Sequence, residues 1–151
     1  MKDLSRTIDY LETRGDLNAG ALGYYGVSWG AAHAVRVVAV EDRIKAAVFV
    51  DGGLQPYSFE RPERDPVHYL PRITIPVLML NGRYDSRFDL KRSQEPMFRL
   101  LGTDAAHKKH SLSDSSHVAA PSPERIQETV SWFDQYLGPV RPKGRLAGAS
   151  D

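Results

Sequence analysis

The sequence predicts an α/β fold, with about four mostly parallel strands in one sheet and helices on its faces. Short apolar runs, among them residues 44–50 and 76–80, alternate with longer segments of helical periodicity. Residues 76–80 are apolar almost throughout, as expected for a strand that is covered on both faces. Because such alternation implies right-handed crossovers, we expect the strands to run parallel.

The first half of the chain is predicted to hold two helices and two strands. Residues 3–14 form an amphipathic helix, with Leu4, Ile8 and Leu11 on one face. A strand at residues 22–25 then leads through a glycine-rich turn into residues 31–40, which are small and apolar nearly all round and predict a buried helix. The second strand is predicted at residues 44–50.

The second half continues the alternation after a loop. Residues 54–72 are rich in proline and charge and predict a long loop with room for one short helix. The strand at residues 76–80, a helix at 90–101 and a weaker strand at 107–112 follow. Ser122-Pro123 is typical of a helix start, and the last helix should place Ile126, Val130, Phe133 and Leu137 on one face.

Composition limits the classes of function. The chain has 151 residues, a net charge of +1 and no cysteine. We therefore expect no nucleic-acid partner, no disulfide, and no thiolate metal site. No apolar run is long enough to span a membrane and no signal peptide is evident, which predicts a cytoplasmic protein without a membrane partner. We expect one domain at residues 1–140 and a disordered tail at 141–151.

The segment Gly26-Val27-Ser28-Trp29-Gly30 provides the candidate nucleophile. It joins a predicted strand to a predicted helix, so Ser28 should lie on a sharp turn with its hydroxyl exposed. Glycines two residues before and after the serine are expected to prevent a collision at this turn. The backbone N–H of Trp29 then lies at a helix start, where it could donate to an oxyanion.

A serine nucleophile needs a base and an orienting acid. His117 is the preferred base, because it lies in a polar loop after the last strand with no packing reason for an imidazole. Asp85 and Asp51 both follow a predicted strand, and we favour Asp85 because its strand should lie nearer the loop of His117. Asp51 stays open as the alternative acid, whereas Asp114 is too close to His117 in sequence to be preferred.

Further residues are candidates for the substrate pocket, namely Tyr25, Asp51 and His68. His33 falls in the buried helix, where a core role is the simpler interpretation, and His107 and His110 belong to a strand with lysines. No spacing of residues is typical of a metal site, and no phosphate-binding loop of the Walker type is present. The sequence therefore predicts neither a metal nor another cofactor.

These motifs resemble those of the α/β-hydrolase superfamily. Residues 23–30 are similar to its nucleophile turn, residues 75–85 to its acid segment, and residues 128–140 to the helix that follows its histidine. Within the superfamily, the chain looks like the esterase and dienelactone-hydrolase or prolyl-oligopeptidase-like branch. The resemblance implies that Ser28, Asp85 and His117 form a triad, that Trp29 is an oxyanion donor, and that acyl esters are substrates.

The resemblance also implies that part of the usual fold is missing. It covers only the C-terminal half of such a domain, starting from the helix before the nucleophile turn, so we predict a truncated α/β-hydrolase. The second oxyanion N–H normally comes from the missing half. The strand at residues 22–25 would then be an uncovered sheet edge, which predicts a homo-oligomer through that edge.

The candidate residues and the resemblance together predict two possible functions. The first is a serine carboxylesterase that hydrolyses small, short-chain acyl esters through an acyl-enzyme. The alternative is a weak or inactive hydrolase remnant that acts as a binding or oligomerisation module. The two hypotheses differ in whether Ser28 reacts.

Overall fold

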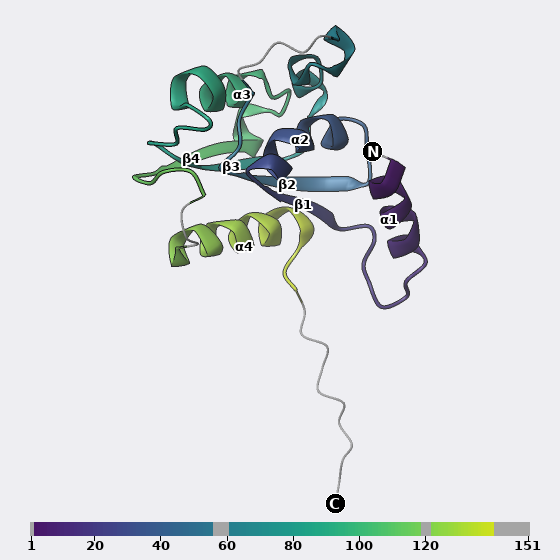
Figure 1. Cartoon of the computed structure of the whole chain (residues 1–151). Coiled ribbons are helices and arrows are strands. Elements are labelled where there is room, and N and C mark those ends of the chain that lie inside the picture. The colour runs from purple at the N-terminus through teal and green to yellow at the C-terminus, as the bar shows by residue number, and fades with distance from the viewer. Residues whose placement is uncertain (1, 56–60, 119–121, 141–151) are drawn as a thin grey trace, which may run out of the picture.

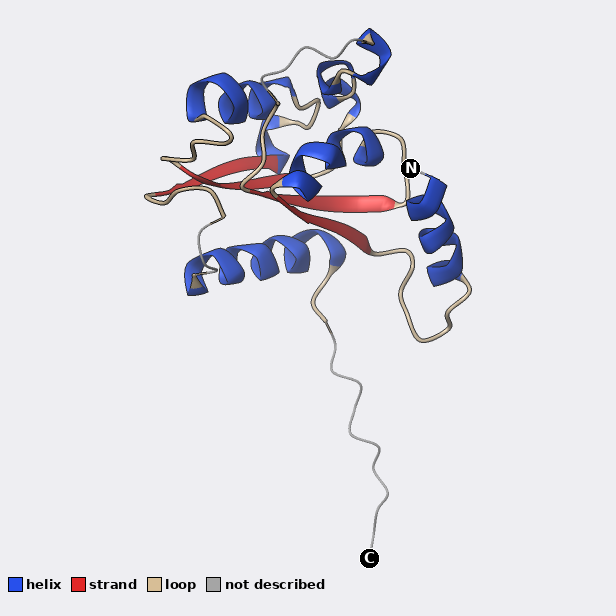
Figure 2. Cartoon of the chain, in the orientation of Figure 1, coloured by secondary structure: helices blue, strands red, loops and turns tan. Residues whose placement is uncertain are grey.

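The computed structural model describes residues 2–55, 61–118 and 122–140, and these residues form one parallel sheet with helices on both faces (Figures 1 and 2). The strand order is the same as the chain order. The strands are β1 (Leu22–Val27), β2 (Ile44–Val50), β3 (Val77–Gly82) and β4 (Lys108–Ser113). The predicted α/β fold is confirmed, and every strand pair is parallel. The predicted tail at residues 141–151 lies outside the described residues.

Helices cover the sheet unequally. Their bounds are α1 (Lys2–Glu12), α2 (Trp29–Val38), α3 (Glu95–Leu100) and α4 (Pro123–Leu137). Figure 1 shows α2 and α3 on one face, α4 on the other, and α1 beside the end where β2 begins. Arg43 holds α1 in this position. Its guanidinium donates to Asp9 and Glu12 on α1 and to Glu41, which precedes β2.

Two apolar cores lie on opposite faces of the sheet. Alternating side chains divide β2 between them: Phe49 belongs to the core under α2, and Val48 to the core under α4. The same alternation divides β3, where Met79 faces α2 and Leu78 faces α4. Burial on both faces explains why these strands are apolar throughout.

The segment predicted as one helix at residues 90–101 is divided. A π-helical turn, Leu90–Gln94, precedes the short α3. Pro96 accounts for the break, because it lacks the N–H that would continue the ladder of hydrogen bonds from residues 90–94. The Asp89 carboxylate caps the turn by accepting from the backbone N–H groups of Lys91 and Arg92. The predicted loop at residues 54–72 contains three short 3₁₀ turns, Pro62–Arg64, Pro66–His68 and Leu70–Arg72.

The apolar face of α4 differs from its prediction. Trp132 is the buried residue of this helix, and Phe133 and Tyr136 pack beside it. Ile126 and Val130 are both more than half exposed. They lie on the part of α4 that borders the edge strand β1, where the described chain provides no further layer.

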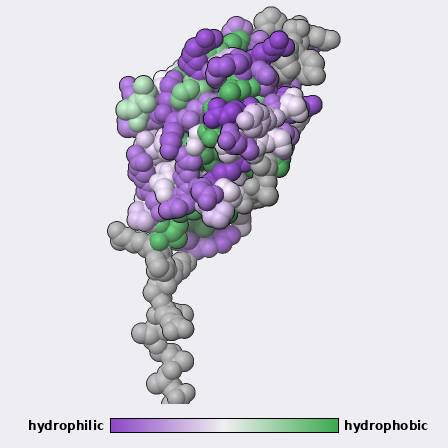
Figure 3. All heavy atoms as spheres, turned by 90° about the vertical axis from the view of Figure 1, so that its left-hand side faces the viewer, coloured by the Kyte–Doolittle hydropathy of each residue, from purple (hydrophilic) through white to green (hydrophobic). Residues whose placement is uncertain are grey.

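None of the described helices is long and apolar enough to cross a membrane. On the face of the molecule that Figure 3 shows, hydrophilic side chains dominate and apolar ones lie scattered between them. The cytoplasmic location remains a prediction.

Candidate active site

Ser28 lies on a strained turn between β1 and α2. Its φ and ψ angles are 51° and −106°, and a positive φ is uncommon for a residue other than glycine. The Ser28 N–H donates to the Val50 carbonyl at 2.7 Å, and its carbonyl accepts from the Ala32 N–H at 2.9 Å. These two bonds tie the turn to β2 and to α2, so the surrounding fold maintains the strained backbone.

The two glycines around Ser28 have different roles. A Cβ atom at Gly26 would lie 2.7 Å from the carbonyl carbon of Gly30, so a side chain there is excluded by backbone. A Cβ atom at Gly30 would meet nothing within 4 Å. The expected collision is therefore confirmed at Gly26, but the expectation was wrong for Gly30, because the crowded space lies on the strand side of the turn.

Asp85 is held in a fixed orientation just beyond β3. Its Oδ1 accepts from the backbone N–H groups of Arg87 at 2.8 Å and Phe88 at 2.9 Å. The residue is 4% exposed. The remaining oxygen, Oδ2, is thus directed at His117, with which it forms a hydrogen bond.

Backbone contacts bring the loop of His117 to the end of β3. The N–H groups of Arg83 and Tyr84 donate to the carbonyls of Ser113 and Ser115, at 2.8 and 2.9 Å. Gly82 allows this approach, because a Cβ atom there would lie 2.4 Å from the Ser115 carbonyl oxygen. The missing side chain at Gly82 thus lets the two loops lie side by side.

The structure brings Ser28, His117 and Asp85 together in one hydrogen-bonded series. The Ser28 Oγ lies 2.8 Å from His117 Nε2, and His117 Nδ1 lies 2.8 Å from Asp85 Oδ2. With its proton on Nδ1, the imidazole can donate to Asp85 and accept from the serine hydroxyl. Three residues separated by up to 89 positions therefore have the arrangement that a serine nucleophile requires.

Trp29 directly follows Ser28 and begins α2. Its N–H belongs to the first turn of the helix, where backbone donors have no partner within the helix. Its indole ring is exposed and rests on the imidazole of His33, with 3.9 Å between the ring centroids. The Trp29 N–H thus lies directly after Ser28 and has no acceptor within α2.

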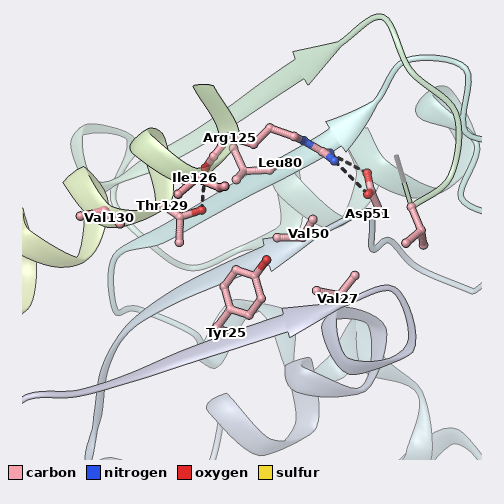
Figure 4. A pocket seen from close by; sticks show the side chains of 10 residues that line it. Tyr25, Val27, Val50, Asp51, Leu80, Arg125, Ile126, Thr129 and Val130 are labelled. Carbon is pink, nitrogen blue, oxygen red and sulfur yellow. Dashed lines mark hydrogen bonds and ion pairs between the residues drawn. The ribbon is translucent and has the colours of Figure 1, made fainter. Parts of the chain in front are cut away.

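An apolar pocket of about 280 Å³ lies next to the series, between β1 and α4 (Figure 4). Val27 and Val118, the neighbours of Ser28 and His117 in the chain, both line it. Two of the candidate pocket residues, Tyr25 and Asp51, line it as well. This pocket is small, and its charged groups lie at one end, where Figure 4 shows the guanidinium of Arg125 beside Asp51.

Asp51, the alternative acid, has a different partner. Its carboxylate forms a two-point ion pair with Arg125, at 2.7 and 3.1 Å, and accepts from the Gly82 N–H at 3.1 Å. The geometry therefore favours Asp85 as the residue that orients His117. Sequence reasoning missed Arg125, because the two partners lie 74 positions apart and no pattern in the sequence links them.

The other histidines lie apart from this series. His68 lines a separate pocket with Glu63, Tyr69 and Arg72, and it is not among the residues of the pocket beside Ser28. Burial lowers the pKa of His110, which bonds to Asn81 Oδ1 across β3 and β4. In α2, burial and then the charge of Arg36 lower the pKa of His33.

Comparison with known proteins agrees with this geometry. Residues 1–137 match the dienelactone hydrolase family along nearly the whole chain. The chain belongs to the dienelactone hydrolase family. A cold-adapted esterase from an Arctic intertidal metagenomic library has a similar structure, with 27% identity and a TM-score of 0.74 over 89% of this chain. The family match and this esterase support a hydrolase and confirm the predicted resemblance.

Two further proteins are similar to this chain, one in structure and one in sequence. The esterase Pf2001 of Pyrococcus furiosus shares the fold at 18% identity, with a TM-score of 0.73 over 90% of this chain. The uncharacterized peptidase YuxL of Bacillus subtilis (strain 168) is 26% identical over 147 residues, covering 77% of this chain and 22% of its own length. The chain spans 56% of the Arctic esterase and 62% of Pf2001, so it corresponds to little more than half of these esterases.

Proposed function

We propose that this chain is a serine carboxylesterase that hydrolyses small, short-chain acyl esters through an acyl-enzyme. The observation that carries the proposal is the series from Ser28 Oγ through His117 to Asp85, with both hydrogen bonds at 2.8 Å. The strained turn at Ser28 and the buried carboxylate of Asp85 support it, since both are typical of a fixed nucleophile and a fixed acid.

In the proposed reaction, His117 Nε2 takes the hydroxyl proton as Ser28 Oγ bonds to the ester carbonyl carbon. The Asp85 carboxylate stabilises the resulting imidazolium, and the Trp29 N–H donates to the oxyanion. When the tetrahedral intermediate collapses, the bond to the alkoxy oxygen breaks and His117 protonates the leaving alcohol. Water, deprotonated by His117, then cleaves the acyl-serine and releases the carboxylic acid.

Two features predict which esters react and how fast. The pocket of about 280 Å³ is apolar and suits a short acyl group better than a long one. Trp29 supplies one oxyanion donor in this proposal. The α/β-hydrolase fold normally uses a second donor, from a loop in the part of the fold that this chain does not cover. Because one such donor is worth about 10²- to 10³-fold in turnover, we expect modest rates from this chain alone.

The test is hydrolysis of p-nitrophenyl acetate, butyrate and octanoate by the wild-type chain and by Ser28→Ala. Ser131→Ala, which removes an exposed hydroxyl from α4, is the matched control. We expect the two shorter esters to react faster than octanoate, and only Ser28→Ala to abolish turnover. If Ser28→Ala retains the wild-type rate, the esterase proposal is wrong.

The alternative, an inactive remnant that serves as a binding module, is favoured by the uncovered edge strand β1. The same assay separates the two functions. A folded wild-type chain that hydrolyses none of the three esters would support the binding module.

A further inference from the structure

The two edges of the sheet differ in their protection against pairing. β4 carries Lys108 and Lys109, and such lysines discourage another strand from pairing at an edge. β1, at the opposite edge, has the sequence LGYYGV and no charge. Of the two edges in the described sheet, only β1 lacks charged residues, so it is the one suited to accept a further strand.

The outward hydrogen-bonding groups of β1 can be assigned from one bond. The Ser28 N–H points to β2, since it donates to the Val50 carbonyl. Along a strand, successive residues direct their N–H and C=O groups to opposite sides. Gly23, Tyr25 and Val27 therefore direct theirs away from β2, toward the open edge.

We propose that two copies of this chain associate through β1, with the strands antiparallel and Tyr25 at the two-fold axis. Tyr25 then exchanges two hydrogen bonds with the partner's Tyr25, and Gly23 exchanges two with the partner's Val27. By symmetry, Val27 also exchanges two hydrogen bonds with the partner's Gly23. The outward N–H and C=O groups of Gly23, Tyr25 and Val27 are then paired in both copies. If one strand slid by two residues along the other, one of these three residue pairs would fall beyond the end of β1 and lose its hydrogen bonds.

Side-chain sizes agree with this register. On the face toward α4, Gly23 lies opposite the partner's Val27, so that the smallest residue meets a branched one. On the face toward α2, Tyr24 lies opposite the partner's Gly26. At the axis the two Tyr25 rings meet, and aromatic pairs across strands stabilise a sheet.

The surroundings of the edge are apolar and uncovered. Tyr25, Ile126 and Val130 are 54%, 54% and 52% exposed, and all three line the pocket between β1 and α4. A second copy at the edge would lie beside this pocket and would cover Ile126 and Val130 of α4. With a net charge of +1, two copies repel one another little.

The joined sheet has eight strands, since each copy contributes four. Its outer edges are the two β4 strands, which carry the lysines. Pairing thus removes the unprotected edges and leaves the protected ones, and a two-fold interface of this kind is closed and does not extend into a fibre.

Disulfide trapping tests the axis directly, because the chain has no cysteine of its own. In the proposed register the two Tyr25 Cα atoms lie about 5.5 Å apart, within the range that a disulfide spans. Val40→Cys is the matched control, since Val40 is an exposed apolar residue outside β1. We expect Tyr25→Cys to form a covalent dimer at least about tenfold faster than Val40→Cys, because pairing raises the effective thiol concentration.

Light scattering supplies the second readout. The wild-type chain and Val40→Lys should be dimers, whereas Tyr25→Lys, with two ammonium groups facing each other at the axis, should be a monomer with an unchanged far-ultraviolet CD spectrum. A wild-type chain that is monomeric at its highest soluble concentration would overturn the proposal. Equal trapping rates for Tyr25→Cys and Val40→Cys would overturn the register as well, and neither result depends on esterase activity.

Discussion

Asp51, at the end of β2, and Arg125, in the first turn of α4, form a buried ion pair. The Arg125 Nη2 lies 2.7 Å from Asp51 Oδ1, and its Nη1 lies 3.1 Å from Oδ2. The Arg125 side chain is 12% exposed and that of Asp51 is 1% exposed. Asp51 has a φ of 47°, which indicates that the fold imposes this conformation. Because α4 follows the loop of His117, the pair fixes one end of the segment that carries the proposed base.

Replacing Arg125 by alanine should destabilise the fold. The Asp51 carboxylate would remain buried with the Gly82 N–H as its partner, and leaving one member of a buried pair alone costs about 3–5 kcal/mol. Urea unfolding measures the loss. Lys91→Ala, which breaks the exposed Lys91–Glu95 pair, is the control and should change the free energy of unfolding by no more than about 0.5 kcal/mol. Equal effects of the two substitutions would contradict this role of Arg125.

The two aspartates at the strand ends should respond differently to amidation. Asp85→Asn leaves a group that can still accept from Arg87 and Phe88 but no longer holds the required tautomer of His117, so turnover should fall about 10⁴-fold. Asp51→Asn removes the charge that pairs with Arg125 and should lower stability more than turnover. Ester hydrolysis and urea unfolding, measured on both variants, check the assignment. A larger loss of turnover in Asp51→Asn would make Asp51 the acid.

Alanine at the two glycines of the nucleophile turn should have opposite effects. At Gly26 the new methyl group would meet the Gly30 backbone at 2.7 Å, and such overpacking costs about 1–3 kcal/mol. At Gly30 the methyl group meets nothing within 4 Å, so a better helix former should stabilise α2 by up to about 1 kcal/mol. Thermal unfolding of both variants measures the difference. Destabilisation by Gly30→Ala would show that this position is crowded after all.

Acid should weaken the attachment of α1. Arg43 lowers the pKa of Glu41 from 4.5 to about 2, with a hydrogen bond of 2.6 Å between Nε and Oε1. Since the folded-state pKa is the lower one, this contribution to stability is complete above the unfolded pKa and is lost as pH falls through the folded pKa. Glu41→Gln should therefore be less stable than wild type near neutral pH, and the gap should narrow as pH falls from 4.5 toward about 2. Urea midpoints across this range measure the gap, and a constant gap would contradict the pairing.

Local patterns predicted most of the fold. The strand expected at residues 44–50 has the same bounds in the structure, because an uninterrupted apolar run has few alternatives. The sequence also allowed us to expect Ser28, Asp85 and His117 near one another, since each follows a strand and parallel strands bring their carboxyl ends to one side. The structure places the three side chains in hydrogen-bonding contact, and their catalytic role stays a proposal.

Features that depend on contacts between distant residues could not be predicted from the sequence. The pairing of Asp51 with Arg125 joins residues 74 positions apart, and neither side chain indicates its partner in the sequence. On α4, helical spacing grouped Ile126 and Val130 with the core residues, but spacing does not show that β1 is the edge strand of the described sheet. Gly82 leaves room for the carbonyls of Ser115 and Ser116, which lie at least 33 positions further along the chain, and the sequence gives no sign of this contact.

In the proposed function, Ser28 is a nucleophile activated by His117 and Asp85. This role is tested most directly by incubating the chain with a fluorophosphonate probe and locating the adduct by mass spectrometry. We expect one adduct per chain, on Ser28, with slow labelling of Asp85→Asn and none of Ser28→Ala. Absence of label on a folded wild-type chain, or label on another residue, would contradict the role of Ser28 as the nucleophile.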